Sequence, residues 1–286
     1  MATLFMIFPD GKRKAFTMSY DDGVESDLRL IDIMRANGLK GTFNINAGLY
    51  APEGTTYPAG TVHRRMTRSQ IDAAYDGMEV AVHGYSHPCL ERMPLGALVE
   101  EVIRDRRELE KQFDTIIRGM ALPFGCRGRG INEDLYQTLR LCGIVYARTT
   151  VPTCDFTLPE DWLRLDPTCH HDDPALPELT RRFLEGDPRT AGSLHDPWMF
   201  YLWGHSYEFD GNDNWELIER FAAEIGGHAD VWYATNMEIY DYVQDWKQMQ
   251  YSADMTRAYN PTARALWLEY DGREYCVQPG ERKKLD

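Results

Sequence analysis

The chain has 286 residues, 43% of them hydrophobic and 12% aromatic, which is enough apolar material for one large domain or two small ones. Its formal net charge of −14 would repel phosphate backbones, which argues against nucleic acid as a partner. No apolar run approaches the roughly 20 residues of a membrane helix, and no basic segment precedes the short apolar stretch at the start. We expect a cytoplasmic protein without a membrane partner. Composition assigns no oligomeric state.

The first elements in chain order alternate between strand and helix. Residues 14–20 predict a strand, and residues 24–38 predict a helix because apolar residues recur there at helical spacing. Strands are predicted again at 39–46 and 78–84, and the longest helical pattern covers 94–113. This alternation indicates strand–helix units.

The same alternation continues through the middle of the chain. Further strands are predicted at 119–125, 143–150, 197–204 and 229–235, with helical patterns near 131–142, 214–225 and 236–248. Six or seven such units favour a parallel sheet with helices outside it, and right-handed crossovers would close it into a barrel or a doubly wound sheet.

The pattern changes after about residue 250. Apolar and polar residues alternate there around Asp271-Gly272, a strong signal for a β-hairpin. The segment is too short for a core of its own. We therefore expect a barrel domain over residues 1–250 and an antiparallel β appendage, packed on the barrel, over 251–286.

Polar side chains follow directly after several of the predicted strands. In chain order they are Asp21-Asp22-Gly23, the pair His83 and His87, Pro123-Phe124-Gly125, and His205. The carboxyl ends of parallel strands meet at one edge, where reacting groups collect. Taken singly, Asp-Asp-Gly is typical of a turn and helix cap, a histidine pair four apart is typical of a surface, and His205 is compatible with a core position. Their shared placement at strand ends favours a site.

These residue types fit metal-assisted hydrolysis. Two neutral imidazoles and one carboxylate form a three-ligand site for Zn²⁺ or a similar ion, with a position open for water. Only one of the two adjacent aspartates needs to bind the metal, so the other is free to act as general base. His205 would stand opposite and protonate the departing group.

Five short motifs resemble the polysaccharide deacetylase family, which is built around the chitooligosaccharide deacetylase homology domain. They are "SYDDG" (19–23), "HGYSHP" (83–88), "LPFG" (122–125), "DW" (161–162) and "LWGH" (202–205), in the order of the family. The resemblance spans roughly residues 14 to 245. It implies a distorted (β/α) barrel with fewer than eight complete units.

The resemblance also implies roles for single residues. Asp21 corresponds to the catalytic base and His205 to the general acid, and the backbone amide of Phe124 helps to form the oxyanion hole. The implied ligands of one divalent ion, for which we expect zinc, are Asp22, His83 and His87. The implied substrate is a carbohydrate.

One departure concerns the charge beside the base. The third motif of the family usually begins with an arginine that pairs with the base, but this chain has Ala121 there. Arg127 or Arg129 is a candidate to reach back to Asp21. Without a cation nearby, the pKa of Asp21 would be less depressed, which would shift the pH optimum or reduce activity.

Other residues near the motifs are candidates for substrate contact. Asp161 and Trp162 resemble the fourth motif, in which the acid tunes the catalytic histidine and the tryptophan walls the site. His171 belongs to an adjacent histidine pair that favours a solvated loop, although one of the pair can enter the groove. Tyr85 and Trp203 flank motif residues and are candidates to stack on a sugar, although aromatic residues in strands are more often core.

Three functions therefore stay open. The first is a metal-dependent hydrolase that removes an N-acetyl, or less favoured an O-acetyl, group from a carbohydrate. The second keeps this chemistry but acts on a small amide or ureide. The third, motivated by the absent arginine, is a carbohydrate-binding protein without turnover.

Overall fold

A computed structural model describes residues 3–126, 133–190 and 196–285. Its largest sheet has eight strands, all of them parallel, in the order β6-β5-β4-β3-β2-β8-β7, with β9 beside β2. The strands are β2 (Lys14–Asp21), β3 (Thr42–Ile45), β4 (Glu79–Val82), β5 (Gly119–Ala121), β6 (Tyr146–Arg148), β7 (Cys169–His170), β8 (Trp198–Gly204) and β9 (Val231–Tyr233). All seven strands predicted in this part of the chain are present, and β7 is additional.

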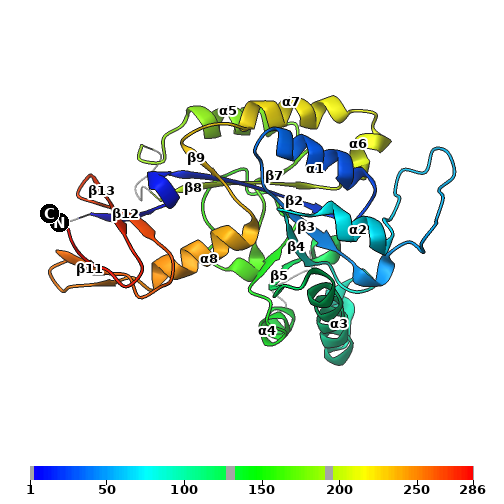
Figure 1. Ribbon diagram of the computed structural model, residues 1–286, viewed down its shortest axis with the longest axis horizontal. Coiled ribbons are helices and arrows are strands. Elements are labelled where there is room, and N and C mark those ends of the chain that lie inside the picture. Colours follow the sequence, from blue (N-terminus) through cyan, green and yellow to red (C-terminus); the bar gives the residue numbers. More distant parts are fainter. Residues whose placement is uncertain (1–2, 127–132, 191–195, 286) are drawn as a thin grey trace.

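Helices cover the outside of this sheet. Figure 1 shows α1, α5 and α7 together on one side, with α3 and α4 on another. The helices are α1 (Ser26–Ala36), α2 (Arg68–Ala74), α3 (Leu95–Phe113), α4 (Glu133–Leu141), α5 (Leu176–Glu185), α6 (Tyr207–Gly211), α7 (Trp215–Ile225) and α8 (Asn236–Lys247). The five predicted helices correspond to α1, α3, α4, α7 and α8.

One segment joins the two edges of the curled sheet. Leu165 forms a parallel bridge with Arg148 at the end of β6. Three residues later the amide of Thr168 donates to the carbonyl oxygen of Tyr201 in β8, at 2.8 Å. The ring is thus completed by a short irregular stretch instead of a regular strand. The expected distorted (β/α) barrel is confirmed.

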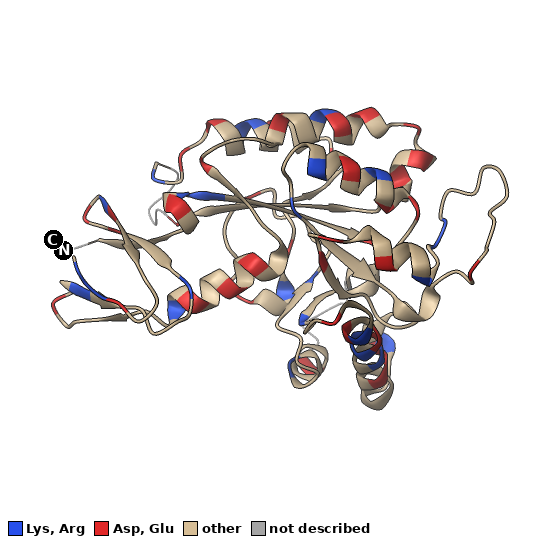
Figure 2. Ribbon diagram, in the orientation of Figure 1, with Lys and Arg blue, Asp and Glu red and all other residues tan. Residues whose placement is uncertain are grey.

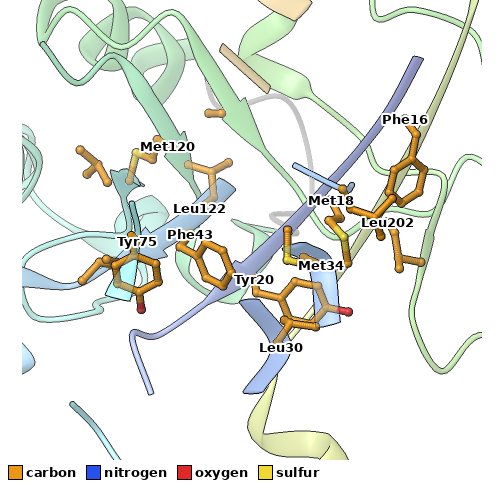
Figure 3. Close-up of a cluster of buried hydrophobic side chains, with 14 of the residues drawn as sticks. Phe16, Met18, Tyr20, Leu30, Met34, Phe43, Tyr75, Met120, Leu122 and Leu202 are labelled. Carbon is orange, nitrogen blue, oxygen red and sulfur yellow. The ribbon is translucent and has the colours of Figure 1, made fainter. Parts of the chain in front are cut away.

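Alternation along β2 separates the outer core from the barrel interior. Phe16, Met18 and Tyr20 point outward and pack with residues of α1 and neighbouring strands (Figure 3). The residues between them have polar partners inside the barrel: Ser19 Oγ lies 2.9 Å from the hydroxyl of Tyr201. Because successive side chains in a strand alternate between faces, Asp21 also faces the interior. The inner wall of the barrel is therefore polar near the carboxyl end of β2.

The C-terminal segment forms two small antiparallel sheets. One contains β12 (Leu266–Tyr270) and β13 (Arg273–Val277), joined at the predicted Asp271-Gly272 turn. The first strand of the chain, β1 (Leu4–Ile7), pairs with β12, so both ends of the chain lie here (Figure 1). The second sheet contains β10 (Gln250–Tyr251), β11 (Arg257–Tyr259) and β14 (Arg282–Lys284). The expected β appendage is confirmed, with β1 as part of it.

Charge is spread over the helices. Figure 2 shows acidic and basic residues intermixed along α1, α3 and α7. Within the described parts of the chain, no helix combines the length and apolarity needed to cross a membrane. A cytoplasmic location stays a prediction.

Candidate active site

The candidate site lies where the parallel strands of the barrel end. Asp21 is the last residue of β2, His83 follows β4 directly, and His205 follows β8 directly. Because the strands are parallel, their carboxyl ends meet at one rim. The structure brings Asp21, Asp22, His83, His87 and His205 together there, as the sequence analysis expected.

Asp22, His83 and His87 form a group that fits a metal ion. One donor atom of each lies within 4.8 Å of the other two. Oδ1 of Asp22 is 4.0 Å from Nε2 of His83 and 3.9 Å from Nε2 of His87. Two imidazoles and a carboxylate around one point are a common protein ligand set of catalytic zinc.

His83 is oriented so that one ring nitrogen is left for a ligand. Its Nδ1 lies 2.8 Å from the carbonyl oxygen of Ala121, which can only accept, so the neutral ring carries its proton on Nδ1 and a lone pair on Nε2. That Nε2 is buried, and no hydrogen-bond partner for it exists among the described residues. An orphaned nitrogen of this kind is suited to a bound cation.

The buried carboxyl group of Asp105 fixes the backbone beside this ligand. It accepts hydrogen bonds from the amide of His83 at 3.0 Å and from that of Ala47 at 2.7 Å. Asp105 lies in α3, whereas the two amides follow β4 and β3. One side chain thus ties a helix to the ends of two neighbouring strands at the rim.

Burial favours the neutral form of both histidines. It lowers the pKa of His83 against the opposing charges of Asp21 and Asp22. Burial, followed by the nearby His83, lowers the pKa of His87 to about 4. Since metals bind the neutral imidazole, both rings are available as ligands near neutral pH.

Three residues at the site adopt left-handed backbone conformations. The φ angles are +86° at Asp22, +56° at His87 and +60° at Phe124. Each such conformation costs a non-glycine residue about 1–3 kcal/mol and is retained only where the surrounding fold imposes it. The ring of Phe124 packs edge-on against His87, with ring centroids 4.7 Å apart. The turn after β5 therefore places residue 124 beside a candidate ligand.

Asp21 has a buried arginine partner that the sequence analysis missed. Nη2 of Arg148, the last residue of β6, contacts Oδ2 of Asp21, and Nδ2 of Asn44 donates to Oδ1 at 2.8 Å. Burial alone would raise the pKa of Asp21, but Arg148, then His83 and His205, lower it below the ordinary value. A cation therefore does face the base, and it comes from residue 148 at the end of β6.

The signal for Arg148 was present in the sequence. It stands inside the predicted strand 143–150, where a charge among apolar residues needs a buried partner. Ala121, where the family's arginine is expected, contributes only its carbonyl oxygen, to His83. The other candidates, Arg127 and Arg129, lie outside the described residues.

His205 lies opposite the metal group and has its own carboxylate. Its Nε2 is 3.8 Å from Oδ2 of Asp21, and its Nδ1 is 3.2 Å from Oε1 of Glu208. Burial opposes the charged ring, but the hydrogen bond to Glu208 and the charge of Asp21 outweigh it and raise the pKa of His205. His205 is thus suited to carry a proton.

The proposed tuning residue Asp161 lies elsewhere. Its side chain accepts from the amide of Leu163 at 3.0 Å and lies 3.5 Å from Arg140 and 3.7 Å from Arg164. The carboxylate beside His205 is Glu208 instead, three residues further along the chain. Expecting Asp161 there was wrong because helix spacing, not the fourth motif, supplies the partner.

Two predicted substrate contacts are also placed elsewhere. Trp162 is buried, and its ring meets Tyr240 of α8 edge-on at 5.3 Å. The ring of Tyr85 is covered by the guanidinium of Arg104, at 3.9 Å, on α3. Both aromatic rings therefore serve packing, which corrects the assignment of Trp162 as a wall of the site and of Tyr85 as a ring that stacks on a sugar.

Trp203 and His171 do lie near the reacting groups. The ring of Trp203 is 4.3 Å from the guanidinium carbon of Arg148 and 5.8 Å from the ring of His205. His171 is buried between the rings of Tyr20 and Phe209, with its Nε2 3.4 Å from Glu208. Trp203 can border a substrate, whereas His171 supports the site from behind.

An arginine and a histidine from the connection between β3 and α2 reach Asp22. Nη2 of Arg65 lies 2.9 Å from Oδ1 of Asp22, and Nε2 of His63 lies 3.2 Å from Oδ2. A backbone bridge between Val24 and Arg65 holds this connection against the turn after β2. The sequence analysis passed over both residues because they follow a Gly/Pro-rich loop without a motif.

Comparison with known proteins finds one matching family model. Residues 9–147 match the model of the family described as "Polysaccharide deacetylase". No curated protein matches the chain. The family match covers β2 and β4, which position Asp21 and His83, and ends one residue before Arg148.

Solved structures with similar folds include three deacetylases or esterases. A putative polysaccharide deacetylase from Mycobacterium smegmatis is 19% identical, with a TM-score of 0.55 over 85% of this chain and 94% of that one. A family 4 carbohydrate esterase from Streptomyces lividans, solved with acetate, is 16% identical, with a TM-score of 0.43 over 78% and 93%. The Streptococcus pyogenes deacetylase PplD is 20% identical, with a TM-score of 0.40 over 47% of this chain and only 55% of its own. The first of these shares the barrel fold.

Proposed function

Given that this chain belongs to the polysaccharide deacetylase family, we propose that it is a metal-dependent hydrolase that removes an N-acetyl group from a carbohydrate. The observation that carries the proposal is the buried, unpartnered Nε2 of His83, which faces Asp22 and His87 beside the Asp21–Arg148 pair. An O-acetyl group is the less favoured target. The protein would act as an enzyme on small or polymeric sugars.

Asp22, His83 and His87 would hold one divalent ion, for which we propose zinc. When bound there, such an ion would polarise the acetyl carbonyl and make water more acidic. Lone pairs on two neutral imidazoles suit this role, and neighbouring groups already fix two of the ligands, since the carbonyl oxygen of Ala121 orients His83 and the guanidinium of Arg65 holds Asp22.

Asp21 would act as the general base. Arg148 keeps its carboxylate ionised, and the amide of Asn44 fixes the orientation of the carboxyl group. An ionised carboxylate in this position can accept the proton of the attacking water. The pair thus fills the role for which the sequence lacked an arginine at residue 121.

His205 would donate a proton to the leaving amine. Glu208 raises its pKa, so the ring is protonated over a wider pH range than a free histidine. The amide of Phe124, next to His87, would donate to the developing oxyanion, and Trp203 would border the sugar. Acetate and a free amine result.

The arginine at residue 148 also bears on the alternatives. The hypothesis of a carbohydrate-binding protein without turnover rested on the absence of an arginine beside the base. Because Arg148 pairs with Asp21, that reason no longer holds. We therefore favour catalysis over binding alone. Hydrolysis of a small amide or ureide can be distinguished from deacetylation by its products, because it releases ammonia or a new carboxylate instead of acetate.

The test uses His83→Ala with His228→Ala as the matched control, since His228 lies on the surface after α7. Acetate release from N-acetylated sugars and bound metal are measured in both. We expect His83→Ala to lose bound metal and to fall below about one hundredth of wild-type activity, while His228→Ala retains both. Wild-type-like acetate release by His83→Ala would contradict the proposal.

A further inference from the structure

We propose that His170, His205 and Glu208 form a second divalent-cation site on the rim, beyond the one expected at Asp22. His170 ends β7, His205 follows β8, and Glu208 lies in α6. One donor atom from each lies within 4.8 Å of the other two. Ligand atoms from β7, from the residue after β8 and from α6 thus converge on one point.

The spacing of the donor atoms fits a shared ion. Nε2 of His170 is 3.2 Å from Oε2 of Glu208, and Nδ1 of His205 is 3.2 Å from Oε1. Ligands that each bind one zinc ion at about 2.0–2.2 Å in tetrahedral geometry lie roughly 3.3–3.6 Å apart. The observed distances therefore need little adjustment.

The second ring nitrogen of His170 strengthens this argument. Its Nδ1 contacts the carboxylate of Asp172 and also accepts a hydrogen bond from the amide of that residue at 3.3 Å. Its Nε2 faces a different carboxylate, that of Glu208, at 3.2 Å. With an ion bound between Nε2 and Glu208, Asp172 would be the carboxylate behind a metal-bound histidine, a frequent arrangement around protein metal sites.

Glu208 lacks any other strong counter-charge. Its ion-pair partners within the described chain are three imidazoles, those of His170, His171 and His205, and no lysine or arginine. His171 is buried, and its Nε2 lies 3.4 Å from Oε2 of Glu208, so it contacts the carboxylate from the protein interior. The carboxylate itself is partly exposed, which leaves an entry path for an ion.

A cation here would compete with the proton that the proposed role of His205 requires, because it would bind the ring nitrogen that now faces Glu208. Coordination would take place through Nδ1, whereas Nε2 is the nitrogen that faces Asp21 at 3.8 Å. The two candidate sites use separate residues, so each can be removed alone. This separation makes the second site testable independently of catalysis.

The test measures the zinc bound per chain, by elemental analysis after metal-free protein is equilibrated with Zn²⁺ and freed of excess. We expect about two equivalents for wild type and for the surface control His228→Ala, and about one for His170→Ala, Glu208→Gln and His83→Ala. Glu208→Gln preserves size and so guards against a folding defect in His170→Ala. Cobalt absorption of the His83→Ala protein would report the second site alone.

One result would overturn the second site. If wild type binds one equivalent, lost in His83→Ala but retained in His170→Ala and Glu208→Gln, protons alone link the histidines to Glu208. The proposed deacetylase would survive that outcome. Its own failure would appear as absent acetate release, whatever the zinc content.

Discussion

Arg148 and Asp21 form a buried ion pair across the interior of the barrel. Their strands, β6 and β2, are separated in the sheet by β5, β4 and β3, so neither a local motif nor strand pairing joins the two residues. Both side chains are almost completely inaccessible. A buried charge that loses its partner costs about 3–5 kcal/mol, so the pair matters for stability as well as for the pKa of the base.

We expect Arg148→Met to reduce kcat/KM about 10²-fold and to move the acidic limb of the pH profile to higher pH. The reason is that loss of the guanidinium raises the pKa of Asp21, which must be ionised to act as base. Arg148→Lys keeps the charge and should retain more activity, with a smaller shift. An unchanged acidic limb in Arg148→Met would show that Arg148 does not tune Asp21.

Gly204 allows the close approach of His171, and Gly204→Ala should disturb it. An added Cβ would stand 2.0 Å from Nδ1 of His171, whose other nitrogen supports Glu208. We expect kcat to fall more than KM rises, because the carboxylate behind His205 moves. Gly96→Ala is the matched control, since nothing lies within 4 Å of its added Cβ in α3. Equal kinetics for the two variants would contradict this role.

Asp27 predicts a pH-dependent part of the stability. Its buried carboxyl group meets the hydroxyls of Ser206 at 2.5 Å and Tyr75 at 2.7 Å, and burial raises its pKa to about 7. The pKa of an aspartate in the unfolded chain is about 3.9. At pH values between this pKa and the folded pKa of about 7, the folded chain therefore binds a proton that the unfolded chain releases. The contribution of the protonated Asp27 carboxyl group to the free energy of unfolding is complete at low pH and is lost as pH rises through about 7.

Asp27→Asn removes this titration. From about pH 5 to pH 8, the free energy of unfolding of wild type should therefore fall relative to that of Asp27→Asn. Denaturant unfolding at several pH values measures the difference. Asp76→Asn, at an exposed position, should show a constant offset from wild type. A constant offset for Asp27→Asn as well would mean that the Asp27 carboxyl is ionised throughout.

Leu268 tests whether the β appendage and the barrel unfold together. Its side chain in β12 is fully buried among residues of β1 and α8. Leu268→Ala should lower the free energy of unfolding by about 2–4 kcal/mol, in one transition. The exposed Leu141→Ala should change it by less than about 0.5 kcal/mol. Two separate transitions would instead indicate that residues 251–286 unfold independently, as a domain boundary near 250 allows.

Residues whose position depends on local pattern were predictable. Short apolar runs predicted the strands that end beside Asp21 and His83, and the Asp271-Gly272 turn predicted the hairpin. By contrast, Arg148 and Arg65 were missed because their partners Asp21 and Asp22 are distant in the chain. Glu208 was missed because it belongs to no recognised motif, although it lies three residues after His205. Asp161 was misassigned because its motif suggested the role, whereas Arg140 and Arg164 hold its side chain elsewhere.

The sequence by itself determined the order of strands and helices, the edge at which polar residues gather and the residues that resemble a deacetylase site. These follow from backbone periodicity, which is local. Only the tertiary structure decided which cation faces Asp21, which carboxylate faces His205 and which aromatic rings border the site. Arg148 meets Asp21 across the barrel, whereas Glu208 follows His205 by three residues, so reach and burial in the fold, not sequence distance, select the partner.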